Sequence, residues 1–120
     1  MESIELANLS RELIEGKKGI DIVLLDISNV SSFADYFVNA TATNIRQLST
    51  IMDEVEKGLS AAGNAPRGIE GRPESGWVLI DAGDVIVNLF LETERDKYQI
   101  EKIWKDAWSE NRHDGKTDEI

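Results

Sequence analysis

Apolar residues recur along this chain with two different periods, one helical and one extended. Residues 4–15 and 45–62 carry apolar side chains at three- and four-residue steps, as amphipathic helices do. Gly16 and Gly63 follow these stripes and are predicted to end the two helices. Both stripes are interpreted as core-facing, because a domain of this size needs the area that they bury.

Runs rich in β-branched and aromatic residues lie between these helices. Residues 20–27 are almost continuously apolar and predict a strand buried on both faces, and residues 35–41 predict a second strand. Thr41 or Thr43 is expected to cap the helix that follows. Glycines and prolines then punctuate the chain, with a short strand predicted around residues 67–70.

Residues 76–90, with the sequence GWVLIDAGDVIVNLF, predict a β-hairpin. Two β-branched runs, 77–80 and 85–91, are separated by the turn-forming residues 81–84 (DAGD). Gly83 lies in that turn, where it can adopt the positive φ that a tight hairpin connection requires. The two strands are therefore predicted to pair antiparallel.

The first strand of this hairpin carries the most informative aromatic residue. Side chains alternate across a strand, so Trp77, Leu79 and Asp81 are predicted to share one face. Burial within the domain's own layers is the ordinary explanation for apolar side chains in such a strand. Trp77 is the expected exception, because it follows the flexible stretch 73–76, where a sheet edge or rim is expected, and tryptophan is enriched in binding hot spots.

A last apolar stripe near the end of the chain predicts a closing helix through Ile100, Ile103, Trp104 and Ala107. The polar residues 109–120 lack periodicity and are predicted to form a disordered tail. Helices that alternate with strands, followed by a hairpin and a helix, predict an α/β fold with one mixed β-sheet flanked by helices. We expect a single domain over residues 1–108.

Composition limits the compartment and the chemistry. The chain has 120 residues, 41% of them hydrophobic, which suffices for one compact core and is too short for two. It contains no cysteine, so disulfides and thiolate chemistry are excluded, and a reducing compartment fits. No apolar run approaches the ~20 residues of a membrane helix, and the start of the chain is acidic and amphipathic rather than signal-like. We expect a cytoplasmic protein with no membrane partner.

The formal net charge of -10 affects the choice of partner. A phosphate backbone is normally bound by a basic footprint, so direct nucleic-acid binding is not expected. A basic protein partner fits better, although an acidic balance can also serve solubility alone.

The chain offers little material for catalysis. Its one histidine, His113, lies in the polar tail, and neither a phosphate-binding GxxxxGK[ST] loop nor a GxGxxG fingerprint occurs. No catalytic residue, metal site or cofactor is therefore expected. The enzymatic alternative rests on Asp26, Asp81 and Asp84, since carboxylates at strand ends can hold Mg²⁺ for phosphoryl or nucleotidyl transfer. Acids at such positions more often organise turns.

Several segments occur in an order and spacing that resemble one known family. They are DYFVNAT (35–41) with Arg46 and Gln47 after it, DEV (53–55), PRGIEG (66–71), WVLIDAGDVIVNLF (77–90), and Arg95, Tyr98, Ile100, Glu101 and Trp104. Together they cover roughly residues 5–107. The chain thereby resembles the ribosomal silencing factor family, also called the Iojap family.

The resemblance implies a noncatalytic α/β domain that is related in shape to nucleotidyltransferases and binds the large ribosomal subunit. The implied partner is ribosomal protein L-fourteen, a basic protein on the intersubunit face, where an occupant would block small-subunit joining and repress translation. A role in large-subunit maturation is the alternative within binding functions, and a metal-dependent nucleotidyltransferase is the alternative among enzymes. A homodimer of the free protein and a monomer both stay open.

The same resemblance supplies candidate contact residues. Four hairpin residues are the leading candidates, and a glutamate before the hairpin and an arginine in the predicted long helix rank after them: Trp77, Leu79, Asp81, Asp84, Glu70 and Arg46. Trp77 and Leu79 are expected to anchor the partner, while the two aspartates would meet its basic groups. For Arg46, an internal ion pair is an equally good explanation.

Three positions depart from the family pattern. Asn88 stands where the family strand usually has histidine, Ala42 where it usually has glycine, and Ala82 where a bulkier turn residue is common. Asn88 removes any function that would need a titrating imidazole at that position. Ala82 is expected to weaken a local apolar contact.

Overall fold

The computed structural model describes residues 1–98 and 108–109 of the chain. Its elements follow the chain in this order: α1 (Ser3–Gly16), β1 (Ile20–Asp26), β2 (Tyr36–Ala42), α2 (Ile45–Ala61), β3 (Gly68–Arg72), the 3-10 turn η1 (Pro73–Ser75), β4 (Trp77–Asp81), β5 (Val85–Leu91), α3 (Glu92–Tyr98) and β6 (Trp108–Ser109).

The strands of the described residues form one mixed sheet with the order β3-β4-β5-β2-β1-β6. The central pair, β2 and β5, is parallel, and every other neighbouring pair is antiparallel. The crossover from β2 to β5 passes through α2, β3 and β4, and β5 therefore pairs parallel with β2 on one side and antiparallel with β4 on the other. The predicted mixed α/β fold is confirmed.

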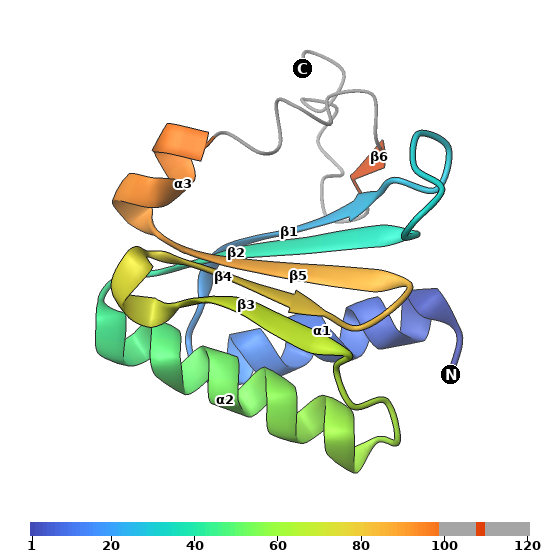
Figure 1. The fold of residues 1–120 in the computed structure, drawn as a ribbon, viewed down its shortest axis with the longest axis horizontal. Coiled ribbons are helices and arrows are strands. Elements are labelled where there is room, and N and C mark those ends of the chain that lie inside the picture. The colour runs from blue at the N-terminus through green and yellow to red at the C-terminus, as the bar shows by residue number, and fades with distance from the viewer. Residues whose placement is uncertain (99–107, 110–120) are drawn as a thin grey trace.

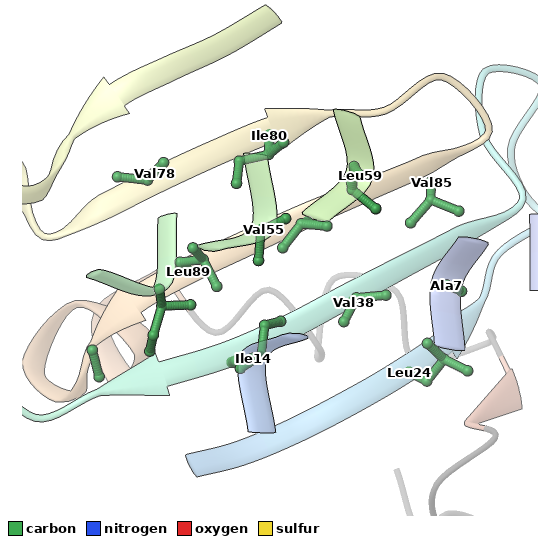
Figure 2. Packing of buried hydrophobic residues seen from close by; sticks show 14 of the residues in the cluster. Ala7, Ile14, Leu24, Val38, Val55, Leu59, Val78, Ile80, Val85 and Leu89 are labelled. Atoms are coloured by element: carbon green, nitrogen blue, oxygen red, sulfur yellow. The ribbon is translucent and has the colours of Figure 1, made fainter. Parts of the chain in front are cut away.

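Helices α1 and α2 lie side by side on one face of the sheet, and α3 lies on its other side (Figure 1). The main core fills the space between the two long helices and the sheet. Figure 2 shows it from close by, with Ile14 of α1, Val55 and Leu59 of α2, and Val38 and Leu89 of the sheet, all at most 1% exposed. The predicted helical stripes therefore face the core along most of their length, as their spacing indicates. The two ends of the second stripe are exceptions, because Ile45 is 44% exposed and Ala62 is exposed.

Several predicted boundaries need correction. The cap of α2 is neither Thr41 nor Thr43: Asn44 accepts a hydrogen bond from the backbone N–H of Gln47 at 2.8 Å. Thr41 is instead buried in β2, and Thr43 lies outside the helix with its hydroxyl donating to the Gln47 side chain. Sequence could not choose between these neighbours, because all three are short polar residues that can cap.

The predicted burial of β1 on both faces is wrong for its first half. Ile20 and Asp21 are exposed, and burial is complete only at Leu24 and Leu25. The register with β2 shifts between Ile20 and Val23, and Asp21 has a φ of +50°, so the start of the strand bends away from regular pairing.

Trp77 does not lie at a sheet edge. Its strand β4 is paired on both sides, with β3 and with β5, and β3 is the edge strand. The turn prediction is confirmed, since Gly83 has a φ of +88°. The predicted closing helix through Ile100 and Ala107 lies outside the described residues, as does most of the predicted tail, so the boundary at residue 108 stays a prediction.

Candidate protein-interaction face

The face of the sheet that points away from α1 and α2 carries the candidate site, and we call it the outer face. Alternation along the strands defines its members, which oppose one another across neighbouring strands: Leu25, Val23, Phe37, Asn39, Thr41, Ile86, Asn88, Phe90, Trp77, Leu79, Asp81, Glu70 and Arg72. Its central part is buried, whereas Trp77 and Leu79 of β4 are partly buried and Glu70 of β3 is exposed. The accessible part of the outer face therefore lies over β3 and β4.

A chain of hydrogen bonds crosses the middle of this face. The indole Nε1 of Trp77 donates to Oδ1 of Asn88 at 3.1 Å, and Nδ2 of Asn88 donates to Oδ1 of Asn39 at 3.0 Å. Asn39 and Asn88 are 0% and 1% exposed and lie opposite each other in the parallel register of β2 and β5. Because buried amides are costly unless they are hydrogen-bonded, this chain holds all three side chains in a single arrangement.

Stacking further fixes the indole. The rings of Trp77 and Phe90 have centroids 5.2 Å apart and planes inclined by 26°, and Phe90 is fully buried. The two residues are direct cross-strand neighbours in the register of β4 and β5. Trp77 is thus a partly exposed aromatic side chain whose conformation is fixed by its contact with Phe90 and its hydrogen bond to Asn88, as a preorganised anchor requires.

A pocket of about 270 Å³ opens beside this indole. The residues that line it, among those described, are Glu70, Gly71, Ser75, Trp77 and Leu79. Glu70 and Leu79 face each other in the register of β3 and β4. Gly71 has a φ of +82°, and a Cβ there would lie 2.3 Å from the carbonyl oxygen of Trp77, so the close approach of the strands needs glycine.

The carboxylates of the two hairpin aspartates, Asp81 and Asp84, differ in their contacts and exposure. Asp81 forms an ion pair with Arg67 at 3.3 Å and also accepts a hydrogen bond from the backbone N–H of Gly83 at 2.9 Å. Asp84 is exposed, and its backbone carbonyl, rather than its carboxylate, accepts from the N–H groups of Asp35 and Tyr36. The carboxylate of Asp84 is therefore the more accessible charge at this end of the sheet.

The other two candidate residues are not brought together. Glu70 lies on the outer face beside Trp77, whereas Arg46 is an exposed residue near the start of α2, in the helical layer behind the sheet. Within the described part of the chain, Arg46 makes no ion pair, so the internal pairing considered for it is not formed there. The structure thus gathers Trp77, Leu79 and Glu70 into one place and leaves Arg46 apart.

Two of the three acids of the enzymatic alternative, Asp26 and Asp81, have structural contacts. Asp26 follows the turn pattern, because its Oδ1 accepts from both the backbone N–H and the hydroxyl of Ser28, at 2.9 and 2.6 Å. Over residues 1–98 and 108–109, no group of three or more acidic, histidine or cysteine side chains could hold a metal ion.

Sequence reasoning missed two features of this face. Asn39 and Asn88 interrupt otherwise apolar strands at positions that turn out to be opposite each other, and a polar residue inside an apolar run is the signal that could have marked them. Arg95 of α3 donates to the backbone carbonyl of Asp21 and to the hydroxyl of Thr41, both at 2.8 Å. That contact ties α3 to the bend of β1 and has no signal in the sequence.

The fold and this face define a class: small mixed-sheet α/β proteins with one sheet face covered by two long helices and the other partly open around an anchored tryptophan. The profile of the family described as "Ribosomal silencing factor during starvation" matches residues 1–119. The chain therefore belongs to the ribosomal silencing factor family, as its motifs indicate.

Individual relatives agree with this assignment. A protein of Chromobacterium violaceum named ribosomal silencing factor RsfS is 39% identical over 104 residues, which cover 87% of this chain and 85% of that protein. The crystal structure of protein CV0518 from the same organism superimposes with a TM-score of 0.84 at 39% identity, covering 87% of each chain. More distantly, a mouse protein named mitochondrial assembly of ribosomal large subunit protein 1 is 26% identical over 95 residues, covering 77% of this chain and 42% of the mouse protein.

In the part of the chain that the structure describes, no helix is both long enough and apolar enough to cross a bilayer.

Proposed function

We propose that this protein is a noncatalytic repressor of translation that binds the large ribosomal subunit through its outer face. The partner on the subunit is ribosomal protein L-fourteen, and the bound protein blocks joining of the small subunit by occupying its place. The observation that carries the proposal is the accessible, preorganised indole of Trp77 beside a pocket that the exposed Glu70 also lines, in a chain of the ribosomal silencing factor family.

The geometry of the outer face supports an interface rather than a reactive site. Interface energy concentrates in a few aromatic anchors whose conformation is fixed before binding, because ordering them on binding would cost entropy. Trp77 meets that description through its contact with Phe90 and its hydrogen bond to Asn88. A steric blocker needs only an occupied surface, so this function requires no reactive group on the outer face.

Charge supports a basic partner. The chain carries a formal net charge of -10, and acids lie around the accessible part of the outer face, with Glu70 beside Trp77 and Asp84 at the hairpin turn. Complementary charge steers two proteins together and mainly raises the association rate.

Co-sedimentation with purified large subunits, combined with a small-subunit joining assay, tests the proposal. We expect Trp77→Ala to weaken binding by ~2 kcal/mol or more, about thirtyfold, and to restore joining in proportion. Ile45→Ala is the matched control, because Ile45 is an apolar side chain with 44% exposure that lies at the start of α2, in the other layer.

Because Trp77 also packs on Phe90, folding must be checked separately. Trp77→Phe keeps an aromatic ring against Phe90, but it replaces the bicyclic indole by a smaller phenyl ring and removes the N–H donor. It should therefore fold and bind more weakly than the wild type. A folded Trp77→Ala protein that binds and blocks joining like the wild type would reject the assignment of the face. Absence of binding by the wild-type protein would reject the function itself.

The charge argument has its own test. Asp84→Asn should lower the association rate and reduce its salt dependence, since Asp84 is exposed at the end of the outer face. Asp53→Asn makes the same charge change on an exposed position of α2 and should leave the rate nearly unaltered if the helical layer faces away from the partner. Equal rates for both variants at every salt concentration would contradict steering by this face.

A role in large-subunit maturation is the second candidate, favoured by the mouse relative whose name refers to assembly of the mitochondrial large subunit. Cells that lack the protein distinguish the two. Accumulation of precursor particles would indicate maturation, whereas mature large subunits that join small subunits too readily would indicate silencing.

A further inference from the structure

The pocket beside Trp77 has a composition that selects a particular kind of occupant. Its lining combines one carboxylate, Glu70, with the indole of Trp77 and the aliphatic side chain of Leu79. The hydroxyl of Ser75 is used internally, because it donates to the carbonyl of Arg72 at 2.6 Å and lies 3.2 Å from the carbonyl of Trp77. The charged group that the pocket offers to a visitor, among the described residues, is therefore the Glu70 carboxylate.

The Glu70 carboxylate is available to bind a group of a partner. It forms no hydrogen bond or ion pair with any residue in the described ranges, and the residue is exposed. Its backbone is fixed nonetheless, because Glu70 pairs with Leu79 in the register of β3 and β4. The next residue, Gly71, is held at positive φ against the carbonyl of Trp77, which brings the carboxylate-bearing strand close to the indole.

The pocket lies just below the usual size of a small-molecule site. Sites for drug-sized ligands usually enclose about 300–1,000 Å³ and bury most of the ligand. A volume of about 270 Å³ that is open to solvent suits a single long side chain of a partner.

We propose that this pocket receives one arginine side chain of the protein partner. Its aliphatic stem would lie along Leu79 and its guanidinium would lie against the indole of Trp77 while it pairs with the carboxylate of Glu70. Arginine fits better than lysine, because the planar guanidinium can pair with a carboxylate through two hydrogen bonds, packs against aromatic rings and is more weakly hydrated than an ammonium group. The inference rests on the proposed function, in that the arginine belongs to the ribosomal partner.

The first experiment measures which side-chain analogues bind in the pocket in the absence of ribosomes. Uniformly ¹⁵N-labelled protein is titrated with N-acetyl-arginine amide, N-acetyl-lysine amide and the uncharged N-acetyl-norleucine amide at constant chloride concentration. We expect the arginine probe to shift the indole signal of Trp77 and the amides of Gly71 and Leu79 with saturation in the millimolar range, the lysine probe to bind at least threefold more weakly, and the norleucine probe to bind at least tenfold more weakly. The Trp77→Phe variant assigns the indole signal.

Substitutions at Glu70 give the control for charge. Glu70→Gln keeps the shape of the side chain and should abolish the preference for arginine over norleucine, whereas Glu74→Gln should preserve it. Glu74 is the matched position because it is also exposed and lies in the adjoining 3-10 turn, but it is not among the described residues that line the pocket. Equal binding of all three probes, or an unchanged preference in Glu70→Gln, would overturn the proposal.

The second experiment uses large subunits and separates the inference from the proposed function. Glu70→Gln should weaken co-sedimentation about tenfold and lower its salt dependence, and Glu74→Gln should do neither. If Glu70→Gln binds as tightly as the wild type, the arginine pocket is wrong and the proposed function stands. If the wild type itself does not bind, the proposed function is wrong, and the probe titration alone then decides whether the pocket selects arginine.

Discussion

The hydrogen-bonded pair of asparagines beneath Trp77 gives the sharpest test of how the outer face is held. Replacing Asn88 by leucine keeps the branched shape of the side chain and leaves no cavity, and it removes the hydrogen bonds of the amide at 3.1 Å with Trp77 and at 3.0 Å with Asn39. Because Asn88 is only 1% exposed, water does not readily replace the lost amide. The substitution therefore isolates the polar contribution from the effect of a cavity.

The expected magnitude follows from the two bonds. Depriving a buried donor or acceptor of its hydrogen bond costs about 1–3 kcal/mol, so the two partners together lose roughly 2–6 kcal/mol. Burial of the added apolar surface returns about 1–2 kcal/mol. We expect Asn88→Leu to lower the free energy of unfolding by ~2 kcal/mol or more, which for a domain of this size corresponds to a fall in Tm of roughly 8 °C.

A double-mutant cycle with Asn39→Leu supplies the control. In the double variant, position 39 is leucine, so no buried amide oxygen is left without the donor that Asn88 supplies in the wild type. The two substitutions together should therefore cost at least ~1 kcal/mol less than the sum of the single costs. Urea unfolding at equilibrium measures all four proteins. Additive costs, or a neutral effect of Asn88→Leu alone, would refute the view that this pair of amides is a coupled structural unit.

Three further substitutions test other parts of the structure. Gly71→Ala should destabilise the protein by ~2 kcal/mol or more in thermal unfolding, since its Cβ would meet the carbonyl of the facing strand at 2.3 Å with φ at +82°, whereas Gly68→Ala meets no atom within 4 Å and should cost far less. Asn44→Ala removes the cap of α2 and should lower the free energy of unfolding by ~1 kcal/mol in urea denaturation; no change would mean that the cap is dispensable. Arg95→Leu removes two hydrogen bonds of 2.8 Å that attach α3 to the sheet, so amide exchange in α3 should speed up at least tenfold while exchange in α2 stays unaltered.

Much of the architecture followed from local pattern. Most apolar residues of the α1 and α2 stripes face the core, and the hairpin of β4 and β5 has its turn at Gly83. Both were predictable because the spacing of apolar residues indicates the helical or extended period of a segment. The assignment to the ribosomal silencing factor family also followed from motif order alone. Alternation along β4 correctly placed Trp77 and Leu79 on one face.

Other features depended on which strands become neighbours. The sequence suggested that Trp77 lies at a sheet edge, but β3 pairs with the outer side of β4. Strand pairing depends on long-range contacts, which the local spacing of apolar residues does not indicate. The same holds for the bend in β1, which the apolar run from Ile20 to Ile27 conceals. Capping by Asn44 rather than its neighbours depended on the backbone conformation at the helix start.

Sequence by itself thus determined the two long helices, the hairpin, the family and the acidic character of this protein, since each is encoded in local spacing, motif order or composition. Only the tertiary structure decided how the accessible part of the outer face is built. The parallel register of β2 and β5 sets Asn39 opposite Asn88, and the antiparallel register of β3 and β4 sets Glu70 opposite Leu79. Hydrogen bonds and pockets require atoms within a few ångströms of each other, and residues 49 apart in the chain reach that distance only when the sheet has formed.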